Sequence, residues 1–85
     1  MMRYTLLNSR WLLGKLRVFS GKEVCEIFQR HDFIEIRRRG SHILMQRKSS
    51  EGTLTIPIPN HQELRIGTLR SIIRQSGISR SEFET

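Results

Sequence analysis

The stretch FIEIRRRGSHILMQRKSSEGTLTIPIP, residues 33–59, decides the fold. Apolar side chains alternate with polar ones in three short runs, which is typical of strands that bury one face. Gly40-Ser41 separates the first two runs, and the polar residues 49–52 separate the second from the third. A two-residue connection that contains glycine is a hairpin turn, because glycine adopts positive φ without strain. The stretch therefore predicts three antiparallel strands.

Strict alternation assigns the faces of these strands. In the first strand, Ile34 and Ile36 point one way, and Phe33, Glu35 and Arg37 point the other. Arg37, Arg39 and His42 then share an open face, and Arg38 faces back. The remaining inward positions are Ile43, Met45, Leu54, Ile56 and Ile58, and the outward ones are Leu44, Gln46, Thr53 and Thr55.

The third strand contains Pro57 and Pro59, which have no amide hydrogen to donate. A strand with this composition is an edge strand or ends at the prolines.

Helices are predicted on both sides of the strands. Ser20 and Glu23 have the spacing of a capping box, and the helix that they begin should end near residues 31–32. Thr68 is expected to cap a second helix, which Gly77 ends with a left-handed residue. Their apolar faces are formed by Val24, Ile27 and Phe28, and by Leu69, Ile72 and Ile73.

The predicted order is helix, three strands, helix. This is an α+β fold of two layers, in which both helices cover one face of a three-stranded antiparallel sheet. Ser79 and Glu82 repeat the capping-box spacing and predict a short C-terminal helix or turn. We expect residues 18–85 to form the domain and residues 1–17 to be an N-terminal extension outside its core.

The composition indicates one small basic domain. Eighty-five residues bury a thin core, and 15 Lys and Arg against 8 Asp and Glu give a net charge of +7. The excess is +4 over residues 1–19 and +3 over residues 20–48, with none over residues 49–85. Such a charge suits a polyanionic partner, although solubility alone explains it equally well.

The single cysteine, Cys25, fits a reducing cytoplasm better than an oxidising compartment, where cysteines usually pair. Beside Val24 in the first helix, it is expected to be a buried structural thiol. No apolar run is long enough to span a membrane, so we expect no membrane association. The three histidines lack the spacing of metal ligands, and we expect no metal site and no cofactor.

The sequence Arg37-Arg38-Arg39-Gly40-Ser41-His42 combines three cations with a histidine at one turn. Cations hold phosphate, and imidazole exchanges a proton near neutral pH. This combination suggests chemistry on a phosphodiester of nucleic acid, or binding of nucleic acid.

Residues 20–78 resemble the HicA family of bacterial toxins, which are mRNA interferases. The resemblance extends over about 60 of the 85 residues, and its central point is Gly40-Ser41-His42 between two flanking blocks. The matching positions are Ser20-Gly21-Lys22-Glu23-Val24, Phe33, Arg39-Gly40-Ser41-His42, Pro57-Ile58-Pro59, His61, Glu63-Leu64, residues 67–75 and Gly77-Ile78.

The resemblance implies a fold like that of the double-stranded-RNA-binding domain (dsRBD-like). It implies a toxin of a type II toxin–antitoxin system that cleaves mRNA and arrests growth, and a HicB-type antitoxin as its partner. The family's catalytic histidine is the one in its Gly-Ser-His motif, and it maps onto His42, which the resemblance therefore implies is the general acid or base. Many relatives carry an aromatic residue or a second histidine directly after this motif, where this chain has Ile43-Leu44-Met45. That departure affects base stacking or affinity rather than proton transfer.

Several other residues are candidates for the site. Lys22 begins the first helix and could grip phosphate, and Arg37 and Arg39 are expected to bind the RNA backbone. Ser41 could donate to phosphate, but its place in the turn explains it equally well. His61 is either an auxiliary proton-transfer group or a residue of the connecting loop.

Two other classes of function compete with the nuclease. A non-catalytic RNA-binding module would have the same fold and charge. A DNA-binding or interaction domain ranks lowest, because three strands separate the two helices and exclude a helix-turn-helix spacing.

Overall fold

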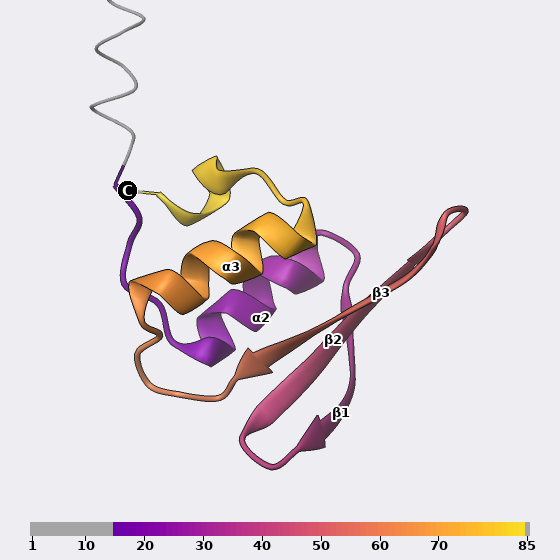
Figure 1. Cartoon of the computed structure of the whole chain (residues 1–85), viewed down its shortest axis with the longest axis horizontal. Helices are drawn as coiled ribbons and strands as arrows, with labels where there is room; N and C mark the ends of the chain where they lie inside the picture. Colours follow the sequence, from indigo (N-terminus) through magenta and orange to yellow (C-terminus); the bar gives the residue numbers. More distant parts are fainter. Residues whose placement is uncertain (1–14, 85) are drawn as a thin grey trace, which may run out of the picture.

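The computed structural model describes residues 15–84 and has the predicted α+β order (Figure 1). Its elements are α2 (Gly21–Arg30), β1 (Ile34–Arg39), β2 (His42–Ser49), β3 (Gly52–Pro59), α3 (Ile66–Ser76) and the 3₁₀ helix η1 (Arg80–Phe83). Most of the expected N-terminal extension, residues 1–14, lies outside the described residues. Leu16 forms a bridge with Glu84, and the Arg17 amide donates to the carbonyl of Phe83 at 2.9 Å, so this segment lies beside the chain's end.

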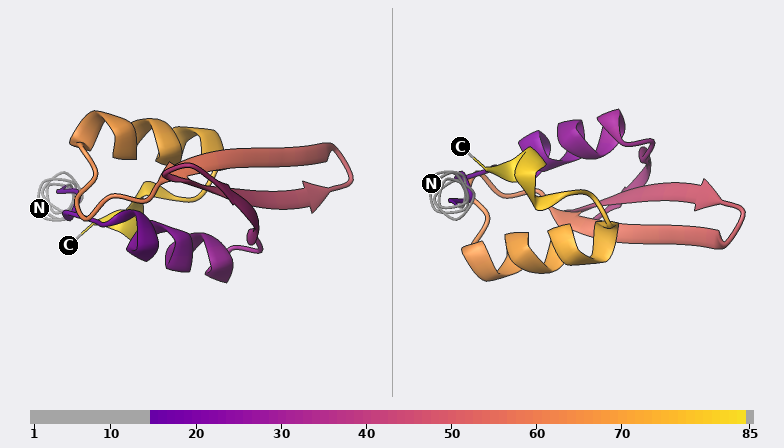
Figure 2. Two further views of the ribbon diagram at one scale, coloured as in Figure 1. Left: turned by 90° about the horizontal axis from the view of Figure 1, so that it is seen from below. Right: turned by 90° about the horizontal axis from the view of Figure 1, so that it is seen from above.

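The three strands form one antiparallel sheet in the order β1-β2-β3. Both helices cover the same face of this sheet, and the β2–β3 hairpin extends beyond them (Figure 2). The inward positions predicted for β2 and β3 are confirmed, since Ile43, Met45, Ile56 and Ile58 are buried and Leu54 packs against the core. β3 is an edge strand that ends at Pro59, as its prolines indicated.

The face assignment of β1 was partly wrong, because the strand contains a β-bulge. Glu35 pairs with Met45, but the next pair is Arg37 with Leu44, so Ile36 is the extra residue. Directly opposed residues share a face. Glu35 therefore lies on the helix-covered face, and Ile34, opposite Gln46, lies on the open face. The bulge returns Arg37 to the open face. Strict alternation predicted this face correctly, but only because it ignored the bulge and placed Glu35 on the open face as well.

The core lies between the helices and the inner face of the sheet. Phe28 and Phe33 pack at 4.6 Å between ring centroids, and Phe19 meets Phe83 edge-on at 5.7 Å. Phe33 precedes β1 and is buried, contrary to its expected outward position. The buried apolar residues are Phe19, Val24, Cys25, Ile27, Phe28, Phe33, Ile43, Met45, Ile56, Ile58, Leu64, Leu69, Ile72, Ile73, Ile78 and Phe83.

The capping box of α2 is confirmed. The Ser20 hydroxyl accepts from the Glu23 amide at 3.1 Å, and the Glu23 carboxylate accepts from the Ser20 amide at 2.9 Å. Gly77 ends α3 with a φ of 74°, as predicted.

The predicted start of α3 was wrong. The helix begins at Ile66, and Thr68 does not cap it. Its N-cap is Arg65, whose side chain forms no capping hydrogen bond within residues 15–84, so the start carries no sequence signal. The C-terminal turn is a 3₁₀ helix in which the Ser79 hydroxyl accepts from the Ser81 amide. The Glu82 carboxylate of this turn lies 3.4 Å from Nε2 of His31.

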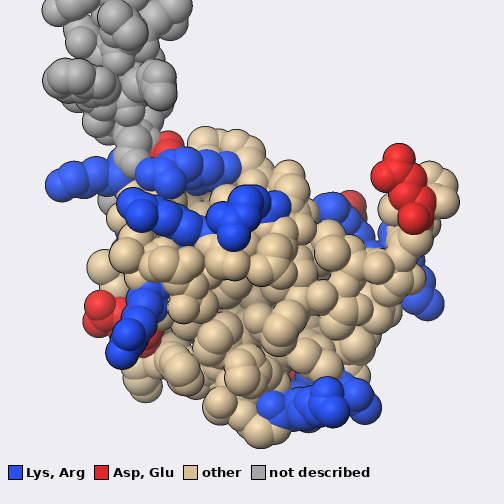
Figure 3. All heavy atoms as spheres, in the orientation of Figure 1, with Lys and Arg blue, Asp and Glu red and all other residues tan. Residues whose placement is uncertain are grey.

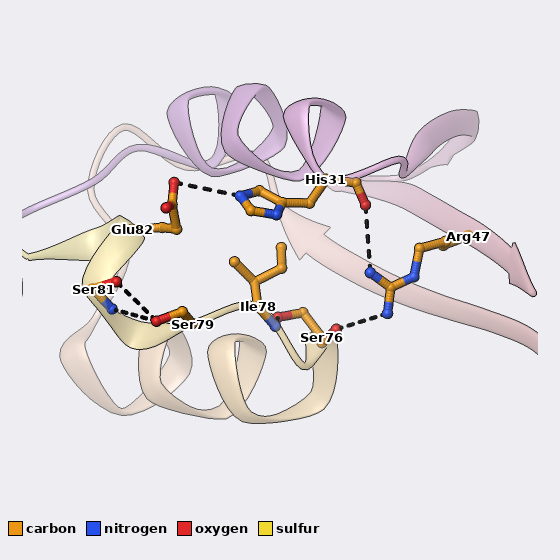
Figure 4. A network of polar contacts seen from close by, with 7 residues as sticks. All are labelled: His31, Arg47, Ser76, Ile78, Ser79, Ser81 and Glu82. Atoms are coloured by element: carbon orange, nitrogen blue, oxygen red, sulfur yellow. Dashed lines mark hydrogen bonds and ion pairs between the residues drawn. The ribbon is translucent and has the colours of Figure 1, made fainter.

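Arg47 joins the layers at the far end of α2 (Figure 4). Its guanidinium donates to the carbonyl oxygens of His31, at 3.4 Å, and Ser76, at 3.3 Å. It also lies 4.6 Å from the centre of the Phe33 ring. One side chain of the sheet therefore connects the C-terminal ends of both helices.

Candidate active site

The hairpin between β1 and β2 presents His42 to solvent. Gly40 adopts a φ of 58° in the turn, and His42, the first residue of β2, is exposed opposite Arg39. Because opposed residues share a face, the imidazole and the Arg39 guanidinium lie on the open side of the sheet. A ligand can approach both groups without any rearrangement of the core.

The three arginines of β1 divide between the two faces. Arg37 opposes Leu44 on the open face with Arg39, and Arg38 opposes Ile43 on the covered face. Arg38 donates to the Glu35 carboxylate at 3.0 Å, and this hydrogen bond lowers the pKa of Glu35 and raises that of Arg38. In Figure 3, Lys and Arg side chains gather over β1 at the lower edge of the molecule. Arg38 is thus engaged with a carboxylate, whereas Arg37 and Arg39 face the side where His42 lies.

The loop after β3 ties the hairpin to the start of α2. The Asn60 amide donates to the Ser41 carbonyl at 2.6 Å, and His42 pairs with Pro59. One residue further along, the His61 carbonyl accepts from the Gly21 amide at 2.9 Å. The hairpin, the loop after β3 and the start of α2 therefore meet within two residues of Pro59, the residue that pairs with His42.

Gly21 permits this close approach. A Cβ at this position would overlap the carbonyl oxygen of Pro59 and would lie 3.0 Å from the Pro59 carbonyl carbon and 3.1 Å from the Asn60 Cα. Only glycine lets the first turn of the helix lie against this loop without displacing it.

A shallow hollow of about 110 Å³ opens where α2 begins. It is lined by Ser20, Lys22, Asn60, His61 and Gln62. Lys22 and His61, two of the candidates from the sequence, therefore line the same hollow. The first turn of α2 adds the positive end of its dipole at the same place.

A comparison with protein families identifies the family of the chain. A family model for the HicA toxin of bacterial toxin–antitoxin systems matches residues 21–78 of the chain. The chain belongs to the HicA toxin family. No curated protein matched it, and no solved structure did. The family resemblance drawn from the sequence is confirmed, and with it the role of a toxin that has a cognate antitoxin.

The matched region of the chain contains all six candidate residues, namely Lys22, Arg37, Arg39, Ser41, His42 and His61. The structure groups them in two sets joined by the loop after β3. Arg37, Arg39 and His42 lie on the open face, and Ser41 lies at the hairpin turn. Lys22 and His61 line the hollow. Their roles in chemistry stay predictions.

Two further features concern metal ligands and the length of the helices. Over residues 15–84, His, Cys, Asp and Glu side chains do not gather in groups of three or more that could hold a metal ion. In the same part of the chain, no helix is long and apolar enough to cross a membrane.

Sequence reasoning missed two residues that shape the site. Gly21 gives close contact between α2 and the loop, and Asn60 fixes the hairpin through its backbone amide. A signal for the first was available, because glycine inside a first helical turn has poor helix propensity and calls for a reason. Asn60 acts through its main-chain amide, and a pattern of side chains in the sequence cannot predict such a contact.

Proposed function

We propose that this HicA-family protein is a metal-independent endoribonuclease, an mRNA interferase whose catalytic group is His42. The observation that supports this proposal most directly is an exposed imidazole on the same sheet face as two exposed guanidinium groups. An imidazole that RNA can reach, beside cations that hold phosphate, has what a general acid or base for phosphodiester cleavage requires.

The reaction uses the RNA as its own nucleophile. A base removes the proton of the ribose 2′-hydroxyl, and the 2′-oxygen attacks the adjacent phosphorus. The bond from phosphorus to the 5′-oxygen breaks, and an acid protonates that oxygen. The products are a 2′,3′-cyclic phosphate and a 5′-hydroxyl. His42 supplies one of these two proton transfers, which is worth about 10²–10⁴-fold in rate.

The neighbouring cations have a separate role. Arg37 and Arg39 hold the backbone on the open face and stabilise the extra negative charge of the phosphorane-like transition state. Lys22 binds a phosphate at the start of α2, where the positive end of the helix dipole also favours an anion. Ser41 contributes a hydroxyl donor at the turn.

His61 is the candidate for the second proton transfer. It lies one residue after Asn60, whose amide holds the hairpin, and it lines the hollow with Lys22. An RNA strand that follows Arg37, His42 and this hollow would meet both imidazoles.

The biological consequence is translational arrest in the cytoplasm. Cleaved mRNA stops protein synthesis and growth, and an antitoxin of the HicB type neutralises the enzyme. The single buried cysteine agrees with a reducing compartment.

Incubation of the purified protein with mRNA in EDTA tests the proposal. We expect cleavage at an undiminished rate, because no step uses a metal, and products that carry 2′,3′-cyclic phosphate and 5′-hydroxyl ends. RNA that is retarded in a gel but left intact would contradict the proposal and identify a non-catalytic RNA-binding module.

A further inference from the structure

The two edges of the sheet differ in how well they are protected from pairing. The β3 edge carries Pro57 and Pro59, which remove amide donors and discourage another strand. The opposite edge, the outer edge of β1, has no proline, and no other strand pairs with it among residues 15–84. An unprotected edge presents a row of amide and carbonyl groups to another polypeptide.

β1 is also unusual in what it exposes. All six of its residues are exposed, including Ile34 at 63% and Ile36 at 41%. This edge strand therefore exposes two branched aliphatic side chains within three residues of each other. Among residues 15–84, the other large exposed aliphatics are Val18 and Ile66, which lie outside the sheet.

The bulge at Ile36 does not close this edge. A bulge is one device that disfavours edge pairing, but it offsets a single residue. On its C-terminal side, Arg37, Arg38 and Arg39 pair in regular register with β2. A strand could therefore add along this segment and reach the isoleucines at its other end.

Charge selects the chemistry of that strand. Arg37, Arg38 and Arg39 are consecutive, and among residues 15–84 only Arg38 of the three has a carboxylate partner, Glu35 at 3.0 Å. A second copy of this chain would bring the same arginines and a net charge of +7. RNA would match the charge but offers neither peptide groups for the edge nor apolar side chains for Ile34. A polypeptide strand with acidic and apolar residues matches the charge of the arginines, pairs with the main chain of the edge and packs against Ile34.

We propose that the cognate antitoxin adds a strand to the outer edge of β1, with acidic side chains toward the arginines and apolar ones toward Ile34 and Ile36. Main-chain hydrogen bonds supply affinity, and the side chains supply specificity. The antitoxin strand would neutralise the toxin because it occupies Arg37 and Arg39 and lies beside β1, the strand that precedes His42. This effect rests on the proposed function.

Substitution of the two isoleucines tests the docking surface. The probe is the purified cognate antitoxin, titrated into full-length toxin. Ile34→Asp and Ile36→Asp should each weaken binding by about tenfold or more, since each loses apolar burial and adds a like charge to an acidic partner. Ile34→Thr, which keeps a β-branched side chain, should weaken binding less. Ile66→Asp, at 49% exposure on α3, is the matched control and should bind as the wild type does.

Amide hydrogen exchange gives a readout that needs no enzymatic activity. In the complex, amides within residues 34–39 should exchange more slowly than in the free toxin. Unchanged affinity of both Asp variants, unchanged exchange in β1, or the absence of antitoxin binding would each overturn the proposal. A wild-type dimer that Ile34→Asp dissociates would do so too, because it would identify a second copy of the chain as the occupant of this edge.

The outcomes also separate this proposal from the nuclease. If the toxin binds antitoxin through β1 but leaves RNA intact, the docking surface is supported and the proposed nuclease activity is contradicted. If the toxin cuts RNA but its β1 variants bind antitoxin as the wild type does, the nuclease activity is supported and the docking surface is contradicted.

Discussion

Replacement of Gly21 by alanine tests how the site is assembled. The new Cβ would overlap the Pro59 carbonyl oxygen and would crowd two further backbone atoms at 3.0 and 3.1 Å. Because these atoms belong to the main chain, they cannot turn away as a side chain would. Either α2 or the loop after β3 must move, and the hydrogen bond from the Gly21 amide to the His61 carbonyl is lost.

The expected cost follows from these contacts. Overpacking costs about 1–3 kcal/mol, and the lost hydrogen bond about 1 kcal/mol. Alanine recovers up to about 1 kcal/mol through its higher helix propensity. The net loss of unfolding free energy is about 1–3 kcal/mol, which lowers the Tm of a domain of this size by roughly 5–20 °C.

Gly67→Ala is the matched control, since it makes the same change in the first turn of the other helix. Among the described residues, no atom lies within 4 Å of a Cβ built at Gly67, so this variant should be as stable as the wild type or slightly more stable. Thermal unfolding followed by circular dichroism measures both. Equal Tm values for Gly21→Ala and the wild type would refute the reasoning.

Three further results are expected. Burial raises the pKa of the Cys25 thiol to about 11, so this thiol should resist a thiol reagent at pH 8. The free energy of unfolding should fall between about pH 9 and 11, because over that range only the thiol of the unfolded chain ionises. The Cys25→Ala variant should lack this part of the pH dependence. Arg47→Gln should lower unfolding free energy in urea by about 1–2 kcal/mol, and Arg47→Lys should not restore it, because one ammonium cannot replace both hydrogen bonds of the guanidinium to His31 and Ser76. Arg39→Gln should weaken RNA binding and reduce the slope of log K against log salt by about 0.7, whereas Lys48→Gln, at the far end of β2, should leave that slope unchanged.

Local chemistry made most of the fold predictable. The capping box of Ser20 and Glu23, the left-handed Gly77 and the alternation in β2 and β3 each depend on residues close in sequence. The bulge in β1 does not, because it depends on how Phe33 enters the core and how the arginines pair with β2. The start of α3 was also beyond prediction, since its N-cap, Arg65, forms no side-chain cap within the described chain.

The candidate site was predictable in its residues but not in its assembly. The motif and the family resemblance single out His42 and its neighbouring cations, and sequence periodicity gives their approximate faces. The contact of Gly21 with Pro59 and the hydrogen bond from Asn60 to Ser41 join residues about 20 to 40 positions apart. Only the tertiary structure reveals that the first helix, the hairpin and the loop with His61 meet.

The rate at which His42→Ala cleaves RNA tests the central claim most directly. The control is His31→Ala, which removes the histidine that pairs with Glu82 at the other end of α2. We expect His42→Ala to lower kcat/KM by about 10²–10⁴-fold while RNA binding persists, and His31→Ala to cleave nearly as the wild type does. Cleavage by His42→Ala at the wild-type rate would contradict the account.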